Sequence, residues 1–254
     1  MSTIADDIWQ SCKGHKFIRP LSGTLYRLVE SQEQIATRQL VDTLEEQALL
    51  EEMLETVKPP YPDHLDHLHY LLKTPFRYPP LKWGSRFGRT FEPSIFYGGC
   101  SVNVTLAESA YYRFVFWHSM DGKPPKNILC SAHTLFSVGY QSDQGVRLQS
   151  PPFDKHLKVI SHPTNYSPTQ HLGTAMRKDG VEVFEYPSAR AHDHGTCVGL
   201  FSAKPFTQNS PLNRQQWFCD VATDAVIFKA VEESKIVRFE LLQFLDDGIL
   251  PIPA

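Results

Sequence analysis

The hydrophobic pattern of this chain changes character near residue 80, and that change constrains the fold more than any other feature. Residues 31–57 place leucine, methionine and valine at spacings of three and four, which predicts an amphipathic helix. KPPYP at 58–62 ends this helix, because proline has no backbone N–H to donate. Residues 63–74 predict a second, short helix, which PFRYPP at 75–80 ends.

Strand-like segments dominate the rest of the chain, where aromatic and β-branched residues rise and glycine and proline recur. The segments predicted as strands are TLYRLVE, FEPSIFYGG, KNILCSAHTLFSVGY, FDKHLKVIS, VEVFEYPS, TCVGLFSAKPF, QWFCDVATDAVIFKA and KIVRFELLQF. Helices are predicted for NVTLAESAYYRFVFWHS and for 167–180, with Ser167 as N-cap, Pro168 at the first helical position and Gly180 past the end.

These segments predict the α+β class, with helices clustered early and strands dominating late. We expect a single catalytic domain over residues 1–254 that carries a helical insertion at about 31–75. The apolar stripe of that insertion is expected to pack on its own domain.

Composition excludes several classes of protein. The formal net charge is −3 and no run of Lys and Arg tracks a phosphate backbone, which argues against direct nucleic-acid binding. The five cysteines are odd in number, widely spaced and without CxxC, so neither a disulfide scaffold nor a zinc ribbon is expected. No stretch approaches the about 20 apolar residues of a membrane span, and MSTIADDIWQ lacks the apolar core of a signal peptide. We expect a soluble, cytoplasmic protein.

Two histidine-rich segments are candidate metal sites. In DHLDHLHY, His64 and His67 would share a helix face but His69 would not, so a solvated polar face is the favoured interpretation. In AHDHGTC, residues 192–194 and Cys197 have no second matching half, which favours an exposed turn. No metal is therefore expected. The GxSxG elbow, the phosphate loop GxxxxGK[ST] and the GxGxxG fingerprint are all absent from the sequence.

Glu108 is the most unusual polar residue, because it lies in TLAESAYYRF, a segment otherwise suited to burial. A buried carboxylate must be hydrogen-bonded or paired, or its pKa shifts, so this position is a candidate functional residue. Other candidates are spread along the chain: Arg27 in TLYRLVE, Arg86 in GSRFG, Tyr97 in SIFYGG and Ser188 in YPSAR.

The order GSRFG, FYGG and TLAE resembles the signature of the RES-domain family, which is named for an Arg, a Glu and a Ser. The spacing from Arg86 to Tyr97 equals that from Tyr97 to Glu108, which fits the rhythm of that family. TLYRLVE resembles the family's opening strand, with Arg27 as its first arginine. Residues 167–201 resemble its C-terminal half, with YPSAR carrying the serine. LLKTPFRYPPL at 71–81 resembles a longer subgroup, and Arg89 competes with Arg86 for the second arginine.

This resemblance implies an ADP-ribosyltransferase-like split β-core with flanking helices and a cleft for NAD⁺. It implies a toxin that consumes NAD⁺ as substrate, by hydrolysis or phosphorolysis of the nicotinamide–ribose bond. The implied partner is a small helical antitoxin whose DNA-binding part resembles the Xre repressors, and the oligomeric state, a homo-oligomer included, stays open. The implied catalytic residues are Glu108, Arg86 and Tyr97; the implied NAD-binding residues are Tyr26, Arg27, Arg86, Tyr97 and Ser188.

The residue types suit this chemistry. Cleavage develops positive charge on the ribose, which a carboxylate such as Glu108 stabilises electrostatically. Arginines give fixed donors for a diphosphate, and a tyrosine gives a flat wall or a hydroxyl contact. Two alternatives stay open: a protein ADP-ribosyltransferase using the same substrate, and a catalytically silent NAD-binding or protein-interaction module.

Overall fold

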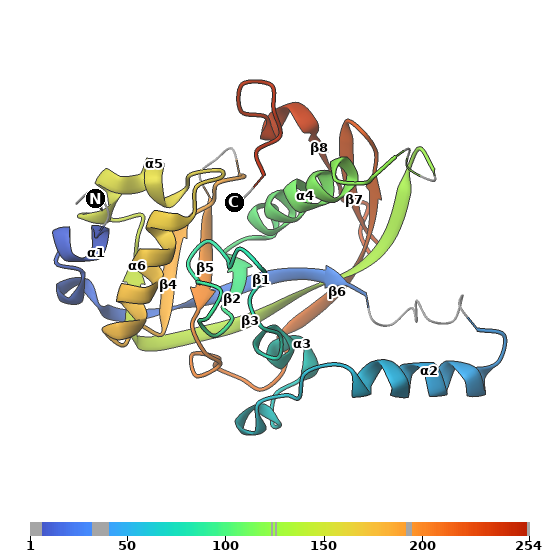
Figure 1. Cartoon of the computed structure of the whole chain (residues 1–254), viewed down its shortest axis with the longest axis horizontal. Coiled ribbons are helices and arrows are strands. Elements are labelled where there is room, and N and C mark those ends of the chain that lie inside the picture. Colours follow the sequence, from blue (N-terminus) through green and yellow to red (C-terminus); the bar gives the residue numbers. More distant parts are fainter. Residues whose placement is uncertain (1–6, 32–40, 123, 125, 192–194, 253–254) are drawn as a thin grey trace.

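The strands among the described residues form one mixed sheet of eight strands. The computed structural model describes residues 7–31, 41–122, 124, 126–191 and 195–252. The spatial order of the strands is β1-β2-β5-β4-β3-β6-β7-β8. Their bounds are β1 Arg19–Glu30, β2 Phe96–Gly99, β3 Leu129–Arg147, β4 Val183–Pro187, β5 Thr196–Leu200, β6 Asn213–Val221, β7 Ala225–Ala230 and β8 Ile236–Glu240. Helices flank this sheet (Figure 1), and the predicted α+β class is confirmed.

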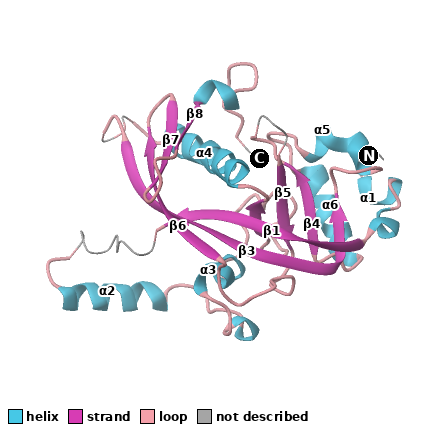
Figure 2. Cartoon of the chain, turned by 180° about the vertical axis from the view of Figure 1, so that it is seen from behind, coloured by secondary structure: helices cyan, strands magenta, loops and turns pink. Residues whose placement is uncertain are grey.

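The sheet is split because two different strands share one edge of β3. Along its other edge, β3 pairs with β1 in an antiparallel ladder that runs from Leu21↔Ser142 to Glu30↔His133. On the shared edge, β6 pairs antiparallel with residues 129–137 and β4 pairs parallel with residues 145–147. Strands β2 and β5 connect β1 to β4, so β1 to β5 close into a ring. Strands β6 to β8 extend from β3 as an open wing (Figure 2).

The helices of the described residues are short apart from three. Their bounds are α1 Ile8–Ser11, α2 Leu44–Thr56, α3 Tyr70–Lys73, α4 Val102–His118, α5 Leu157–Ile160 and α6 Ser167–Lys178. Single 3-10 turns are η1 Gly14–Phe17, η3 Asp63–Leu65, η4 Thr74–Phe76, η5 Phe153–His156 and η6 Leu241–Phe244. Over the described part of the chain, no helix has the length and apolar character needed to cross a membrane.

Helix α4 begins where the sequence predicts and covers the open wing. Ser101 caps it, because its side chain accepts a hydrogen bond from the Val104 N–H at 3.3 Å. The buried residues of its inner face recur at spacings of three and four and are Leu106, Ala110, Phe114 and Trp117. They form one core with Trp217 and Phe228 of the wing, and Figure 1 shows α4 lying beside β7 and β8. This packing holds the polar second turn of α4, which carries Glu108, toward the closed ring.

Helix α6 packs on the closed ring and positions the loop at 84–88. Its first residue is Ser167, so the cap is Tyr166 and the predicted cap is one residue late. Gly180, with φ of +79°, lies past the helix end as predicted. A Cβ at Gly173 would lie 1.9 Å from the carbonyl oxygen of Phe87, so only glycine lets the 84–88 loop lie this close to α6.

The segment FDKHLKVIS, predicted as a strand, is helical in the structure and forms η5 and α5. Phe153 and Ile160 are fully buried, and Leu157 lies between them at the spacing of a helix face. A short apolar run of this kind fits either element, and the packing of its buried side chains against the core beside α6 decides for the helix.

The expectation that the apolar stripe of the insertion packs on its own domain is wrong for α2. It holds for the 63–74 part, whose leucines are buried in the core. In Figures 1 and 2, α2 projects from the body of the molecule. Its apolar side chains are largely exposed: Leu44, Leu49, Met53, Leu54 and Val57. Helix α2 is held at its C-terminal end, where Glu55 pairs with Arg77 at 2.6 Å. Residues 32–40 of the predicted insertion lie outside the described residues.

Candidate functional site

Glu108 and Ser188 form the centre of the candidate site. Ser188, which follows β4, donates its hydroxyl hydrogen to Oε1 of Glu108 on α4 at 2.5 Å. The same hydroxyl oxygen accepts the backbone N–H groups of Arg190 at 3.1 Å and Ala191 at 3.0 Å. A hydroxyl has one donor and two acceptor positions, so all three are in use. Ser188 is also buried, at 2% exposure, and its geometry is that of a residue that orients Glu108.

Cys197 on β5 is a second neighbour of this carboxylate, and the sequence did not single it out for this role. Its Sγ lies 3.7 Å from Oε1 of Glu108. Burial and the nearby carboxylate raise the pKa of the Cys197 thiol well above its usual value. The thiol therefore keeps its proton at neutral pH, and it serves as a weak donor to Glu108 rather than as a nucleophile.

Arg86 brings positive charge to the same region. Its NH1 donates to the carbonyl oxygens of Ile160 at 3.2 Å and His162 at 2.8 Å. Its guanidinium stacks over the ring of Tyr166 at 4.4 Å. Burial opposes the charge, but the attraction of the Tyr166 hydroxyl and the Glu108 carboxylate outweighs it, so the pKa of Arg86 is raised.

Arg89, the competitor for this role, lies in a different environment. Its guanidinium stands 5.9 Å from the ring of Phe91, an exposed side chain, and its backbone N–H donates to Glu92 at 2.8 Å. The Glu108 carboxylate contributes to the raised pKa of Arg86, whereas the described contacts of Arg89 are with Phe91 and Glu92.

Tyr97 on β2 anchors the loop that carries Arg86. Its hydroxyl pairs with the Ser85 hydroxyl at 2.9 Å and accepts the backbone N–H of Phe87 at 3.1 Å. Burial raises the pKa of this phenol to about 12, so it stays protonated. Tyr97 is half-buried, and its hydroxyl is hydrogen-bonded to Ser85 and Phe87, the residues that flank Arg86 in the sequence.

Tyr26 and Arg27 are neighbours on β1, so their side chains point to opposite faces of the sheet. Tyr26 packs against the core beneath α4, and its carbonyl oxygen accepts the Thr105 hydroxyl at 3.1 Å. Arg27 instead lies over the ring of Phe96 at 4.9 Å and donates to the carbonyl oxygen of Tyr97 at 2.6 Å. Burial lowers the pKa of Arg27 to about 10.

Apart from Tyr26, which packs against the core beneath α4, the candidate residues fall into two groups. Ser188 is hydrogen-bonded to Glu108 on the second turn of α4, and the Glu108 carboxylate helps to raise the pKa of Arg86; we call these three residues the carboxylate cluster. Arg27 and Tyr97 instead line a cleft of about 640 Å³ beside it.

Two buried residues that sequence reasoning missed support the carboxylate cluster. Arg190 is 6% exposed, lies 3.5 Å from the ring centre of Tyr111, and donates to the carbonyl oxygen of Pro163 at 2.6 Å. Tyr166 lies under the guanidinium of Arg86. Both arginines thus hold the 160–163 loop through its carbonyl oxygens. The position of Arg190 two residues after Ser188 in YPSAR was the only available signal.

The candidate metal ligands do not converge. Nδ1 of His69 accepts the backbone N–H of Leu71 at 3.2 Å, so it caps α3. His192, Asp193 and His194 lie outside the described residues. His64 lies in η3 and His67 in the turn that follows it. No group of three such ligands forms within the residues that the structure describes.

Comparisons with known proteins place the chain in a family. No curated protein was found to match it. A crystal structure of the M. tuberculosis MbcT–MbcA toxin–antitoxin complex is similar to it, with a TM-score of 0.45 and 11% identity, over 85% of this chain and 92% of that one. The family model for the RES domain matches residues 62–221, more than half of the 254 residues. This chain therefore belongs to the RES domain family.

Proposed function

We propose that this protein is a toxin that consumes NAD⁺ by cleaving the nicotinamide–ribose bond, through hydrolysis or phosphorolysis. The observation that carries the proposal is the Glu108 carboxylate, in a chain of the RES family: a buried serine orients it at 2.5 Å, and its charge acts on the buried Arg86. A fixed carboxylate of this kind stabilises the positive charge that develops on the ribose as nicotinamide leaves.

Glu108 is the proposed catalytic residue, because it is the group in the carboxylate cluster with an acceptor oxygen to offer a ribose. Arg86 contributes positive charge, while its own donors hold the loop at 160–162. Tyr97 orients the loop that carries Arg86. Ser188 orients Glu108, so its predicted role as a direct NAD⁺ contact gives way to a positioning role.

NAD⁺ binding is assigned to Arg27, Tyr97 and Tyr26 beside the carboxylate cluster. Arg27 lines the cleft and offers a guanidinium to a phosphate. Tyr26 contributes through the face of β1 that packs beneath α4. NAD⁺ is the substrate in this proposal, and no metal takes part.

The cellular setting follows from the family resemblance. We propose that residues 1–254 form one catalytic domain, that the protein acts in the cytoplasm, and that a small Xre-like antitoxin inhibits it. Direct binding to nucleic acid is not part of the proposal.

Nicotinamide release tests the proposal. The purified protein is incubated with NAD⁺, with and without inorganic phosphate, and free nicotinamide is followed by chromatography. Release that rises with phosphate identifies phosphorolysis, and release that is independent of phosphate identifies hydrolysis. ADP-ribose found on lysate proteins by mass spectrometry, without free turnover, would instead identify a protein ADP-ribosyltransferase. NAD⁺ binding without either product would identify a silent module.

A further inference from the structure

A cleft lies beside the carboxylate cluster, between the 58–81 segment and strands β1 and β2. It has a volume of about 640 Å³, within the range of about 300–1,000 Å³ that small-ligand pockets occupy. Strand β1 contributes Arg27 and Val29, and β2 contributes Tyr97. The opposite wall includes Tyr61, Tyr70, Arg77, Tyr78, Pro79 and Pro80. Glu108 and Ser188 do not line it, so the cleft is distinct from the carboxylate cluster.

Arg27 is a half-buried cation that lines this cleft without a counter-ion. No carboxylate among the described residues forms an ion pair with it. Its Nε is buried and has no hydrogen-bond partner. Burial alone lowers the pKa of its guanidinium to about 10. A partly desolvated charge with an unpartnered donor is stabilised by an anionic ligand.

The other charges around the cleft are already paired. Arg77 and Lys58 both contact Glu55 of α2, at 2.6 and 2.9 Å. Glu30, which also lines the cleft, pairs with Arg113 at 2.8 Å. Among the described residues, Arg27 is therefore the cation in the cleft that is available to a ligand. A single available cation favours a ligand with one phosphate group over a polyanionic ligand.

The 58–81 wall supplies flat apolar surface at the rim of the cleft. Tyr70 and Tyr78 are 38% and 42% exposed, and Pro79 and Pro80 follow Tyr78 directly. The ring of Tyr61 already lies under two cations, Lys73 at 4.4 Å and Arg77 at 4.3 Å, and so belongs to the wall itself. Exposed tyrosine rings of this kind are platforms on which nucleobases stack.

We propose that this cleft binds a purine nucleoside monophosphate group, with its base on the tyrosine rings of the 58–81 wall and its phosphate at Arg27. Two sources share this chemistry. One is the adenosine half of NAD⁺, in which case the inference rests on the proposed function and the 58–81 segment sets substrate affinity. The other is a separate nucleotide that occupies the cleft independently of turnover.

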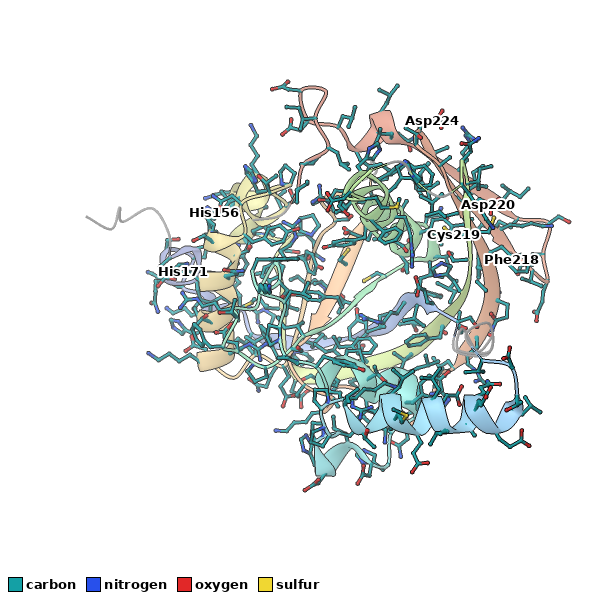
Figure 3. All side chains as sticks on the ribbon, turned by 45° about the vertical axis from the view of Figure 1, so that its right-hand side comes forward. His156, His171, Phe218, Cys219, Asp220 and Asp224 are labelled. Carbon is teal, nitrogen blue, oxygen red and sulfur yellow. The ribbon has the colours of Figure 1, made fainter. Side chains whose placement is uncertain are left out.

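Titration of the full-length protein with AMP tests this site directly, by calorimetry and without any turnover. We expect saturable binding, with adenosine binding more weakly because it lacks the phosphate. Tyr78→Ala should weaken AMP binding about tenfold, as expected for loss of one stacking ring. Arg27→Gln should weaken AMP binding at least as much, and Arg27→Lys, which keeps the charge if the glutamine variant fails to fold, should weaken it less. Phe218→Ala removes a comparably exposed ring on β6, away from the cleft, and should leave AMP binding unchanged (Figure 3).

Turnover assays then separate the two sources. Competitive inhibition of NAD⁺ consumption by AMP, with a raised KM in Tyr78→Ala, identifies the cleft as the adenosine subsite. AMP binding that leaves the KM for NAD⁺ unchanged in wild type and Tyr78→Ala identifies a separate nucleotide site. A wild-type protein that binds no AMP at millimolar concentration, or a Tyr78→Ala variant that binds it as tightly as wild type, overturns the inference. A protein that binds AMP in this way but never consumes NAD⁺ contradicts the proposed function alone.

Discussion

Ser188 gives its only hydroxyl hydrogen to Glu108, 80 residues away along the chain, at 2.5 Å. The contact joins the turn after β4 to the second turn of α4, and two backbone N–H groups fix the serine from the other side. The hydrogen bond holds the carboxylate in one orientation. Glu108 is therefore positioned before any substrate arrives, which is how a fixed charge contributes to catalysis.

Replacing Ser188 by alanine should lower kcat more than it changes KM. The variant removes a charge-assisted hydrogen bond to the proposed catalytic carboxylate, so we expect kcat to fall about ten- to a hundredfold. Steady-state kinetics of NAD⁺ consumption measure this. A large rise in KM with an unchanged kcat would show instead that Ser188 contacts the substrate.

Arg86→Ala should weaken NAD⁺ binding, because it removes the positive charge that interacts with Glu108 and releases the carbonyl oxygens of Ile160 and His162. The matched control is Arg89→Ala, whose guanidinium faces the exposed Phe91. Calorimetric titration of NAD⁺ into both variants, each combined with Glu108→Gln to stop turnover, measures the difference. Weaker binding in Arg89→Ala with normal binding in Arg86→Ala would transfer the role to Arg89.

His133 should make the folded state sensitive to mild acid. Burial lowers the pKa of its imidazole to about 4, against about 6.5 in an unfolded chain. Because the folded pKa is the lower one, the neutral imidazole contributes stability above pH 6.5 that is lost as the pH falls toward 4. We expect this group to lower the free energy of unfolding by about 2 kcal/mol between pH 7 and pH 5.

Urea unfolding of wild type and His133→Gln at both pH values measures that contribution. The variant should lose less stability on acidification than the wild type does. Equal losses in the two proteins would show that His133 titrates normally in the folded state.

The exposed apolar residues of α2 should contribute little to the stability of the isolated chain. Met53→Ser changes a side chain that is 59% exposed, so we expect the free energy of unfolding to change by no more than about 0.5 kcal/mol. Leu71→Ala, at 5% exposure in the core beneath the ring, should cost about 2–4 kcal/mol. Chemical denaturation of both variants checks this, and similar losses would mean that α2 packs on the domain after all.

Local patterns in the sequence predicted much of the fold. The alternation of TLYRLVE and the run around FYGG became strands β1 and β2, and the helix predicted for NVTLAESAYYRFVFWHS became α4. The predictions that failed concerned segments whose pattern fits two structures, or features that depend on residues far away in the sequence. Phe153 to Ile160 is too short to distinguish strand from helix by its pattern alone. The apolar spacing in 31–57 predicted a helix but could not say whether anything covers it.

The candidate site shows the same limit. Glu108 stood out because a carboxylate in an apolar segment needs a partner, and that inference depends on local sequence alone. Its partners could not be inferred from local sequence, because Ser188 and Cys197 reach Glu108 only once β4 and β5 have paired in the ring. Nothing local indicates that Arg190 lies on the ring of Tyr111, 79 residues earlier in the chain.

The central claim is that the carboxylate of Glu108 performs the chemistry, and nicotinamide release by Glu108→Gln tests it most directly. Glu182→Gln is a matched control, because Glu182 also accepts a serine hydroxyl, that of Ser142 at 2.6 Å, away from the carboxylate cluster. The account predicts that Glu108→Gln folds like the wild type but loses nearly all nicotinamide release, whereas Glu182→Gln keeps it. Release at the wild-type rate by a folded Glu108→Gln variant would contradict the account.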